Sequence, residues 1–412
     1  MSDGMPELLK RAHREYSNKG LSGLVTNGLS FVARDFWLEK LLDKRSVSRT
    51  ELQEIAAEDG KIWYMDEESG IHINPPSNQR LREEFKSYPT DFTPERPFVC
   101  ELSGCHLIGD YAVGLTAEDR LVTETAPVYK DGSIKKLGIN LGQYLRICGI
   151  NKKSAERYEE DRVFPLVTPY SSYYHWVTEY LPKLRLLEYY MKETGDEPTI
   201  LVESKPRSFV RESLEVMGYP PSSYKEWSRN EMYIDRLIVP LHRIHSFDYY
   251  KPSSSNYNPS RDDLGWLRQK VRSGIERNKR REQNKRIYIS RQKTGSEHTS
   301  SRKVINYNEV EDVLGEFGFK SYVLEELSFQ DQAELFINAE VIMGPHGAGL
   351  VNMIFSDDPL IIELFPKNKL KPHFYYISEI MGFEYEAVVS DNEGDDLVVD
   401  IDTLRGRLAT IL

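Results

Sequence analysis

Two patterns of hydrophobic and polar residues alternate between residues 160 and 250. Predominantly apolar segments (163–169, 198–203 and 233–241) are separated by segments of helical pattern, SSYYHWVTEYL (171–181) and SFVRESLEVMG (208–218). Apolar runs of this length are typical of strands that are buried on both faces of a sheet. The alternation therefore predicts βαβ units in a parallel sheet.

The same alternation returns after residue 285. The expected strands are RIYISR (286–291), KSYVLE (320–325), EVIMG (340–344) and LIIELF (360–365). Helical patterns lie between these strands, and a further helix is expected after HGAGL. This succession predicts a doubly wound α/β unit, in which ligands bind at the carboxyl ends of the strands.

The remaining regions set the predicted domain limits. Residues 1–90 are charged and helical in pattern, and KPSSSNYNPSRDD (251–263) has the Ser, Pro and Asn content of an interdomain linker. We therefore predict two α/β domains that face each other across a cleft. The four predicted parts are a helical N-terminal extension (1–90), a first domain (91–255), a second domain (256–390) and a C-terminal tail (391–412).

Charge and cysteine content narrow the class of protein. The 412-residue chain has a formal net charge of -11, which argues against a nucleic-acid partner, because phosphate neutralisation needs a basic face. Its three cysteines (Cys100, Cys105 and Cys148) match neither a disulfide framework nor a zinc or redox motif. We expect a reducing, cytoplasmic location.

Two segments raise the question of a membrane surface, although no apolar run approaches the ~18 residues that span a bilayer. Residues 20–45 mix aromatic, leucine and basic residues, and residues 268–286 carry nine Lys or Arg against two Glu. Both patterns suit peripheral contact with the inner face of the cell membrane. They also suit a helix packed on its own domain and a solvated helical face.

The stretch GPHGAGLVN (344–352) follows a predicted buried strand and precedes a predicted helix. Glycines let the backbone approach a ligand closely, and the first turn of a helix offers unpaired N–H groups and a positive dipole end. His346 adds a hydrogen-bond donor or, if it is protonated, a charge. The stretch suits a diphosphate, and it also suits a tight turn that binds nothing.

Arginines and a histidine supply further candidate chemistry. Arg286, Arg291 and Arg302 flank or follow the strand RIYISR, and guanidinium groups match the geometry of phosphate oxygens. His175 and Glu179 are four residues apart and share a helix face, with Pro182 expected to kink or end that helix. A histidine oriented by a carboxylate is a general-base candidate, whereas the plain alternatives are surface arginines and a surface pair.

Acidic residues near the glycine stretch suggest one more contact. Glu363 lies in the strand LIIELF, where a carboxylate can accept both hydroxyls of a ribose, or can instead pair with Lys367. The acidic pair of Asp357 and Asp358 fits a loop better than a metal site. We therefore expect no bound metal.

The segments in this order resemble glycosyltransferase family 61, which includes capsular-polysaccharide-type enzymes. The resemblance is carried by HWVTEYLPKL, RIYISRQ with the later RKVINYNEV, ELSFQDQAELFINAEVIMGPHGAGLVN and IIELFP. It implies a GT-B fold, with two Rossmann-like domains facing across a cleft, and an inverting, metal-independent transfer from a nucleotide sugar.

The resemblance and the residue chemistry imply the same roles. His175 would be the base that deprotonates the acceptor, and Glu179 would orient or replace it. The nucleotide sugar would contact residues of the second half of the chain. These are Arg286, Arg291, Arg302, Ser328, Phe329, Gln332, His346, Gly347, Ala348, Gly349, Asn352 and Glu363.

The expected function is transfer of a hexose, pentose or N-acetylhexosamine to a hydroxyl of a glycan or lipid-linked glycan. A uridine diphosphate sugar is the expected donor, no cofactor is expected, and the product would belong to cell-surface polysaccharide or glycoconjugate synthesis. Two alternatives stay open. They are a noncatalytic glycan-binding or scaffold protein of a polysaccharide assembly, and a GT-B-like nucleotide-sugar epimerase.

Overall fold

The structure of the protein is a computed structural model, described for most of the chain. The described residues are 45–126, 139, 141–147, 161–170, 172–228, 231–243, 260–275, 285–292 and 302–412. Residues 20–44 and 276–284, which carry most of the two possible membrane-contact segments, lie outside them, as does Cys148. In the described part of the chain, no helix is both long enough and apolar enough to cross a bilayer.

Contacts divide the chain into two compact units that interleave along the sequence. The first comprises residues 1–62, 100–169 and 227–239, and the second comprises 63–99, 170–226 and 240–412. The predicted consecutive limits at residues 90, 255 and 390 stay a prediction. The predicted fold class is confirmed in its coarser part, because the structure is mixed α/β with parallel strands.

The first unit is built on strands in the order β1-β7-β6-β5-β11-β8. Strands β8 and β11 pair in parallel, as the alternation predicted, whereas β6 pairs antiparallel with both β5 and β7. The elements are β1 (Ser46–Val47), α4 (Arg49–Glu58), β5 (Phe98–Ile108), β6 (Val113–Leu115), β7 (Leu121–Val122), η3 (Thr123–Thr125), α6 (Leu141–Ile147), β8 (Arg162–Pro165) and β11 (Glu231–Pro240).

The second unit begins near β2 and contains the rest of the elements. Its first part holds β2 (Ile62–Tyr64), β3 (Ile71–His72), α5 (Gln79–Phe85), β4 (Asp91–Phe92), α7 (Tyr173–His175), η5 (Trp176–Tyr180), α8 (Lys183–Thr194), β9 (Thr199–Glu203), α9 (Ser208–Val216), η6 (Pro221–Ser223), β10 (Tyr224–Trp227) and α10 (Arg261–Gly274). Its second part holds β12 (Arg286–Ile289), α11 (Tyr307–Glu316), β13 (Lys320–Tyr322), η7 (Leu324–Glu326), α12 (Phe329–Ile337), β14 (Val341–Pro345), η8 (Ala348–Phe355), β15 (Leu360–Pro366), α13 (His373–Met381), β16 (Glu384–Glu393), β17 (Asp396–Val398) and α14 (Ile401–Ile411).

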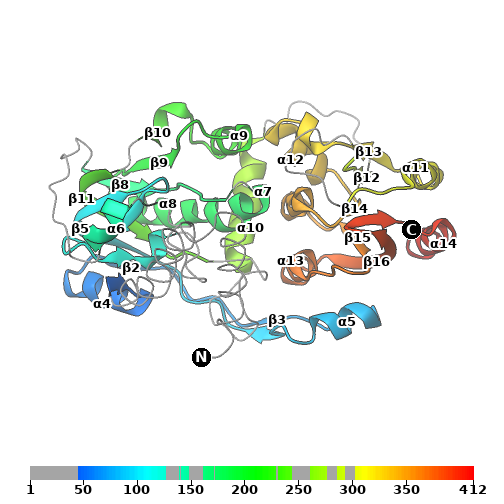
Figure 1. Ribbon diagram of the computed structural model, residues 1–412, viewed down its shortest axis with the longest axis horizontal. Helices are drawn as coiled ribbons and strands as arrows, with labels where there is room; N and C mark the ends of the chain where they lie inside the picture. Colours follow the sequence, from blue (N-terminus) through cyan, green and yellow to red (C-terminus); the bar gives the residue numbers. More distant parts are fainter. Residues whose placement is uncertain are drawn as a thin grey trace, which may run out of the picture. The chain divides into compact units, whose positions relative to one another are not determined.

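The sheet of the second unit is parallel except at one edge. Its order is β13-β12-β14-β15-β16-β17, and only β16 and β17 pair antiparallel. Strand β13 lies on one side of β12, whereas the later strands follow on the other side (Figure 1). The chain therefore changes direction between β12 and β14, and in doubly wound sheets ligands bind at the carboxyl ends of the strands at such a switch point.

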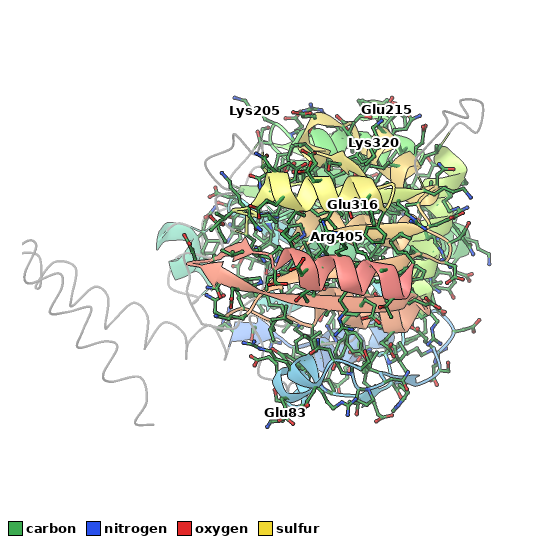
Figure 2. All side chains as sticks on the ribbon, turned by 90° about the vertical axis from the view of Figure 1, so that its right-hand side faces the viewer. Glu83, Lys205, Glu215, Glu316, Lys320 and Arg405 are labelled. Atoms are coloured by element: carbon green, nitrogen blue, oxygen red, sulfur yellow. The ribbon has the colours of Figure 1, made fainter. Side chains whose placement is uncertain are left out.

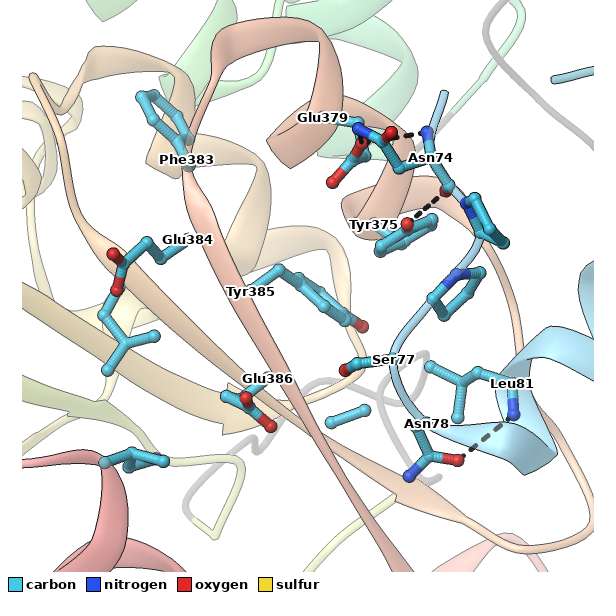
Figure 3. A pocket seen from close by; sticks show the side chains of 15 residues that line it. Asn74, Ser77, Asn78, Leu81, Tyr375, Glu379, Phe383, Glu384, Tyr385 and Glu386 are labelled. Carbon is cyan, nitrogen blue, oxygen red and sulfur yellow. Dashed lines mark hydrogen bonds between the residues drawn. The ribbon is translucent and has the colours of Figure 1, made fainter. Parts of the chain in front are cut away.

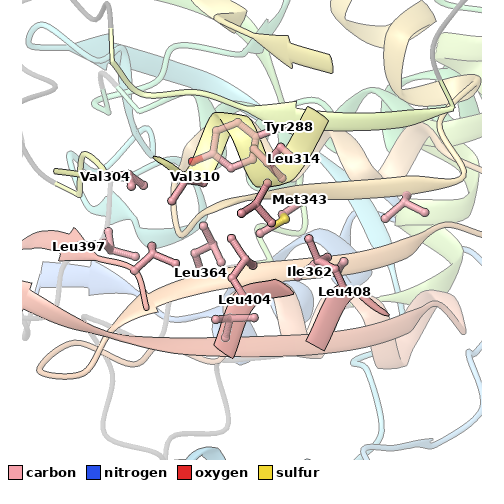
Figure 4. Packing of buried hydrophobic residues seen from close by; sticks show 14 residues of the cluster. Tyr288, Val304, Val310, Leu314, Met343, Ile362, Leu364, Leu397, Leu404 and Leu408 are labelled. Carbon is pink, nitrogen blue, oxygen red and sulfur yellow. The ribbon is translucent and has the colours of Figure 1, made fainter. Parts of the chain in front are cut away.

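Apolar residues on the strands face helices on both sides of this sheet. Helices α11 and α14 lie on one side and α13 on the other (Figure 1). Between the strands and the helix pair, residues such as Tyr288, Leu314, Met343, Leu364 and Leu404 form a buried cluster (Figure 4). This packing fixes the strand ends that carry the candidate site.

The ends of these helices show why the sequence folds locally as it does. Ser328 caps α12 by accepting a hydrogen bond from the Asp331 amide, and Gly382 ends α13 with a left-handed φ of 77°. On the outer surface, Arg405 of α14 forms a two-pronged ion pair with Glu316 of α11, with distances of 2.9 and 3.0 Å (Figure 2). Exposed pairs of this kind contribute little to stability because solvent screens them, so the apolar cluster dominates the packing.

Candidate active site

The candidate site lies at the switch point of the second unit. Arg291 follows β12, and the loop of His346 and Gly347 follows β14. The loop is fixed because the His346 amide donates a hydrogen bond of 2.9 Å to the Leu364 carbonyl on β15. Parallel strands thus bring an arginine and a histidine from segments 55 positions apart to one sheet edge.

The glycines of the loop serve packing within the protein. A Cβ on Gly344 would lie 3.0 Å from Cβ of Ile289, and a Cβ on Gly349 would lie 2.7 Å from Leu324. A Cβ on Gly347 would overlap Nη1 of Arg291. Gly347 has an extended φ of -179°, so space is what requires a glycine here. The sequence predicted that a ligand would approach the backbone closely at these glycines. In the structure, the Arg291 guanidinium occupies the space next to Gly347.

We expect Gly347→Ala to displace the Arg291 guanidinium while the protein stays folded, because the atom in the way is the end of a flexible side chain. Losing a charge-assisted contact should weaken binding of the diphosphate that the sequence predicts for this loop by about 10-fold. Isothermal titration calorimetry would measure this. Gly315→Ala in α11 is the matched control, because no atom lies near its Cβ, and it should leave binding unchanged. Equal affinity of the two variants would contradict the prediction.

His346 takes part in a buried chain of hydrogen bonds. Its Nδ1 is bonded to Oε1 of Glu363, and the Tyr385 hydroxyl donates to Oε2 of the same carboxyl group at 2.6 Å. Burial raises the pKa of Glu363 well above its ordinary value and lowers the pKa of His346 well below its own, with repulsion by His373 adding to the second shift. Both directions favour a protonated carboxyl group that donates to Nδ1 of a neutral imidazole. Nε2 then carries the hydrogen of His346 and can donate it to a ligand.

The raised pKa of Glu363 predicts a pH dependence of stability. A carboxyl group of this kind contributes stability that is present below its unfolded-state pKa, near 4.5, and is lost as pH rises through the higher folded-state pKa. Glu363→Gln keeps a hydrogen-bonding group but cannot ionise. We therefore expect the free energy of unfolding of Glu363→Gln, relative to the parent, to increase as pH is raised from about 4.5 towards 8.

Urea denaturation at several pH values would measure this difference. His346 acts in the opposite sense, since its lowered pKa makes stability fall as pH drops below 6.5, but it is present in both proteins. Glu215→Gln, an exposed change on α9, serves as the control. A difference between Glu363→Gln and the parent that does not vary with pH would exclude an elevated pKa.

A second histidine and carboxylate pair comes from η5, the turn that precedes Pro182. Nδ1 of His175 lies 2.9 Å from Oε1 of Glu179, as the four-residue spacing predicted. The helix widens to a π-helical turn at Trp176–Tyr180, and α8 begins after Pro182, because proline cannot donate to a carbonyl of the preceding turn. Glu179 is fully buried, and the His175 ring stacks on Tyr170 with a centroid distance of 4.2 Å.

Both histidines line one cavity of ≈ 170 Å³, which we call the histidine pocket. Its lining residues are Ser172, Tyr174, His175, Arg302, His346, Gly347, Ala348, Lys371, His373 and Phe374. The lining contains the basic side chains of Arg302 and Lys371 and no carboxylate, so its field favours an anion. The sequence-predicted residues His175, Arg302, His346, Gly347 and Ala348 are thus brought together, with Arg291 packed behind Gly347.

Lys371, His373 and Tyr174 were not predicted from the sequence. Lys371 and His373 follow the carboxyl end of β15, in KNKLKPHF, and this position was a signal that could have indicated them. Tyr174 precedes His175 in the sequence, and its ring packs edge-on against the ring of His373, with 5.3 Å between the ring centroids.

Other predicted residues lie away from the pocket. Arg286 is at the amino end of β12, where it donates to the Phe317 carbonyl at 2.7 Å. Glu363 lies behind His346, with both carboxyl oxygens bonded. Gly349 packs against Leu324, and Ser328 caps α12.

Phe329 and Gln332 lie on α12 and Asn352 lies on η8, and all three make contacts within the protein. Asn352 accepts from the Tyr173 hydroxyl at 2.6 Å and donates to Gln332 at 2.9 Å, and Gln332 donates to the Leu324 carbonyl at 2.8 Å. Phe329 packs edge-on against Phe355. Among the residues that the structure describes, no group of three or more His, Cys, Asp or Glu is arranged to hold a metal ion. Metal independence stays a prediction.

Residues 173–362 match the family model of glycosyltransferase 61. The resemblance predicted from the sequence is therefore confirmed over this segment. The match begins at the turn that carries His175 and Glu179 and ends next to Glu363. It includes Arg302 and the His346 loop, and it stops before Lys371 and His373.

Two individual proteins show a more distant similarity. A β-1,2-xylosyltransferase of Arabidopsis thaliana is 34% identical over 67 residues, which is 16% of this chain and 12% of that protein. The bacterial iron-containing dodecameric glycosyltransferase TibC from enterotoxigenic E. coli H10407 is 9% identical, with 54% of this chain and 63% of that chain covered at a TM-score of 0.27. The chain thus spans about an eighth of the first relative and less than two thirds of the second.

Proposed function

We propose that the protein is an inverting glycosyltransferase that moves a sugar from a nucleotide-diphosphate sugar to a hydroxyl of a glycan or lipid-linked glycan. The observation that carries the proposal is the histidine pocket, where two carboxyl-bound histidines stand beside Arg302 and Lys371 at the switch point of a parallel sheet. The family match over residues 173–362 supports the same reaction class.

The diphosphate of the donor would lie against the basic side of the pocket. Arg302 and Lys371 supply positive charge, and Arg291 adds to it from behind Gly347. His346 donates from Nε2, because its Nδ1 is held by Glu363. When the bond between the anomeric carbon and the diphosphate oxygen breaks, its electron pair leaves with the diphosphate. Preorganised cations and donors stabilise this charge without a metal.

The acceptor hydroxyl would be deprotonated by His175. With its Nδ1 hydrogen donated to Glu179, the imidazole presents the Nε2 lone pair to the pocket. The acceptor oxygen bonds to the anomeric carbon on the face opposite the diphosphate, which inverts the configuration, and its proton moves to Nε2. Glu179 acts as a positioning residue, because it is fully buried and touches His175.

The pocket size limits what it holds. A cavity of ≈ 170 Å³ is smaller than the roughly 300–1,000 Å³ typical of whole-ligand sites, so it suits the reacting groups of the donor. The nucleoside would lie outside it. Glu363 is proposed to position His346, in place of the ribose contact that the sequence suggested, since both of its oxygens are already bonded.

The cellular role follows from the same proposal. The enzyme would act in the cytoplasm, peripherally at the inner membrane face, in the synthesis of a cell-surface polysaccharide or glycoconjugate, with a uridine diphosphate sugar as the first donor to test. The alternative of a noncatalytic scaffold is disfavoured by the two oriented histidines. The alternative of an epimerase is disfavoured because an epimerase has no acceptor. It would not need His175 as a base that deprotonates an acceptor hydroxyl.

A thermal-shift screen against nucleotide sugars in the presence of EDTA tests the proposal. We expect one donor class to raise the melting temperature, with stabilisation that grows with donor concentration and is unaffected by EDTA. Nuclear magnetic resonance of the product should show the opposite anomeric configuration from the donor. No stabilisation by any nucleoside diphosphate or nucleotide sugar would support a scaffold instead, and isomerisation of the donor without acceptor would support an epimerase.

A further inference from the structure

A second and larger cavity lies on the same unit, at the amino ends of β15 and β16. It has a volume of ≈ 490 Å³, and we call it the acidic groove (Figure 3). One wall is the segment Asn74–Leu81, and the opposite side is formed by α13 and the start of β16. The lining residues are Asn74, Pro75, Pro76, Ser77, Asn78, Leu81, Leu360, Tyr375, Glu379, Phe383, Glu384, Tyr385, Glu386, Ala387 and Ile411.

The walls of the groove are held in place by hydrogen bonds between them. Asn74 donates to Glu379 from its backbone amide at 3.0 Å and from its side chain at 2.8 Å, and the Tyr375 hydroxyl donates to the Asn74 carbonyl. Asn78 caps α5, which anchors the other end of the segment. A ligand would therefore enter a preformed site and would lose little affinity to ordering of the protein.

The chemistry of the lining suits a neutral, polyhydroxylated ligand. Three carboxylates (Glu379, Glu384 and Glu386) line the groove, and no Lys, Arg or His does. Such a field repels phosphates and other anions, in contrast to the histidine pocket. Carboxylates accept strong hydrogen bonds from hydroxyl groups, and aromatic rings such as Tyr385 cover the apolar face of a ring-shaped ligand.

Several of these groups have hydrogen-bonding capacity to spare. Within the described part of the chain, the side chains of Ser77, Glu384 and Glu386 make no hydrogen bond or ion pair. Ser77 belongs to the wall of residues 74–81, and Glu386 belongs to β16 on the other side of the groove (Figure 3). Donors and acceptors thus meet a ligand from two sides.

The groove adjoins the proposed active site through α13 and Tyr385. On α13, His373 and Phe374 line the histidine pocket, whereas Tyr375 and Glu379 line the groove. Tyr385 lines the groove, while its hydroxyl donates to Glu363, the partner of His346. We propose that the acidic groove binds neutral sugar units of the acceptor glycan, away from the end that reacts. That the bound glycan is the acceptor rests on the proposed function, whereas binding of a neutral glycan by the groove does not.

Retention of oligosaccharides on a printed array of neutral and anionic glycans tests this proposal. We expect the full chain to bind neutral oligosaccharides in preference to sialylated or uronate-containing ones. Ser77→Trp should lower that binding at least about tenfold, because the new ring fills the groove, and Glu386→Gln should lower it by a similar factor through loss of a charge-assisted hydrogen bond. Ser222→Trp, on the exposed turn η6, is the matched control and should bind as the parent does.

Two results would overturn the proposal. One is absence of binding to every neutral oligosaccharide, and the other is binding that Ser77→Trp and Glu386→Gln leave unchanged. Donor binding, measured on the same variants by thermal shift, separates this test from the proposed function. If the parent binds neutral glycans through the groove but no nucleotide sugar stabilises it, the groove assignment stands and the transferase assignment fails.

Discussion

Replacing His175 by alanine is expected to lower kcat about 10²–10⁴-fold, the usual contribution of a general base, while donor affinity stays within about a factor of two. The reason is that His175 would contact the acceptor hydroxyl and the diphosphate would contact other groups. Rates in single-turnover experiments with saturating donor would measure the effect. Because the chemical step is the one affected, KM for the donor should not rise in parallel.

Two companion variants distinguish a base from a structural residue. His175→Gly leaves a space of imidazole size, so added imidazole should restore part of the rate if a proton acceptor is what was lost. Glu179→Gln should reduce kcat by a smaller factor, about 10–100-fold, because the base is still present but is held less well. If imidazole rescues nothing while the variant is folded and binds donor, His175 is not the base.

Arg302→Ala is expected to weaken donor binding about 10–100-fold, and Lys371→Ala to weaken it by a similar or smaller factor. Each variant removes a cation from a pocket that contains no carboxylate, and a charge-assisted hydrogen bond contributes about 1.5–3 kcal/mol. Arg302 has a left-handed φ of 70°, and alanine would carry the same backbone cost. Calorimetry with the donor or with its nucleoside diphosphate would measure the loss.

Arg286→Ala is the matched control for this prediction. Its guanidinium donates to the Phe317 carbonyl at the opposite end of β12, so stability should fall and donor affinity should not. Arg302→Lys is informative as well, because lysine keeps the positive charge but not the planar guanidinium group. Its donor affinity should lie between that of the parent and that of Arg302→Ala. Equal losses of affinity in Arg286→Ala and Arg302→Ala would place the diphosphate elsewhere.

Parts of the fold and of the site could be predicted because they depend on local sequence. The alternation of apolar runs and helical segments predicted the parallel strands β12, β14 and β15, since burial on both faces requires such runs. The spacing of His175 and Glu179 predicted their contact, because residues four apart share a helix face.

Other features depend on contacts between distant segments, which no local pattern encodes. The sequence suggested a ribose contact for Glu363, but the roles of a carboxyl group depend on what surrounds it. Here His346 and Tyr385 occupy both of its oxygens. Likewise, Arg286 and Arg291 are equivalent in sequence, whereas the direction of β12 puts them at opposite ends of the sheet.

The glycine stretch GPHGAGLVN shows both sides of this division. By itself the sequence determined that a buried strand ends in a loop with little side-chain volume, because glycine has no side chain and alanine has only a methyl group. Only the tertiary structure decided what fills the space: the Arg291 guanidinium over Gly347, and His175, Arg302 and Lys371 around His346. The physical reason is that a side chain's chemistry is carried in the sequence, whereas its neighbours, its burial and hence its protonation are set by strand order and packing.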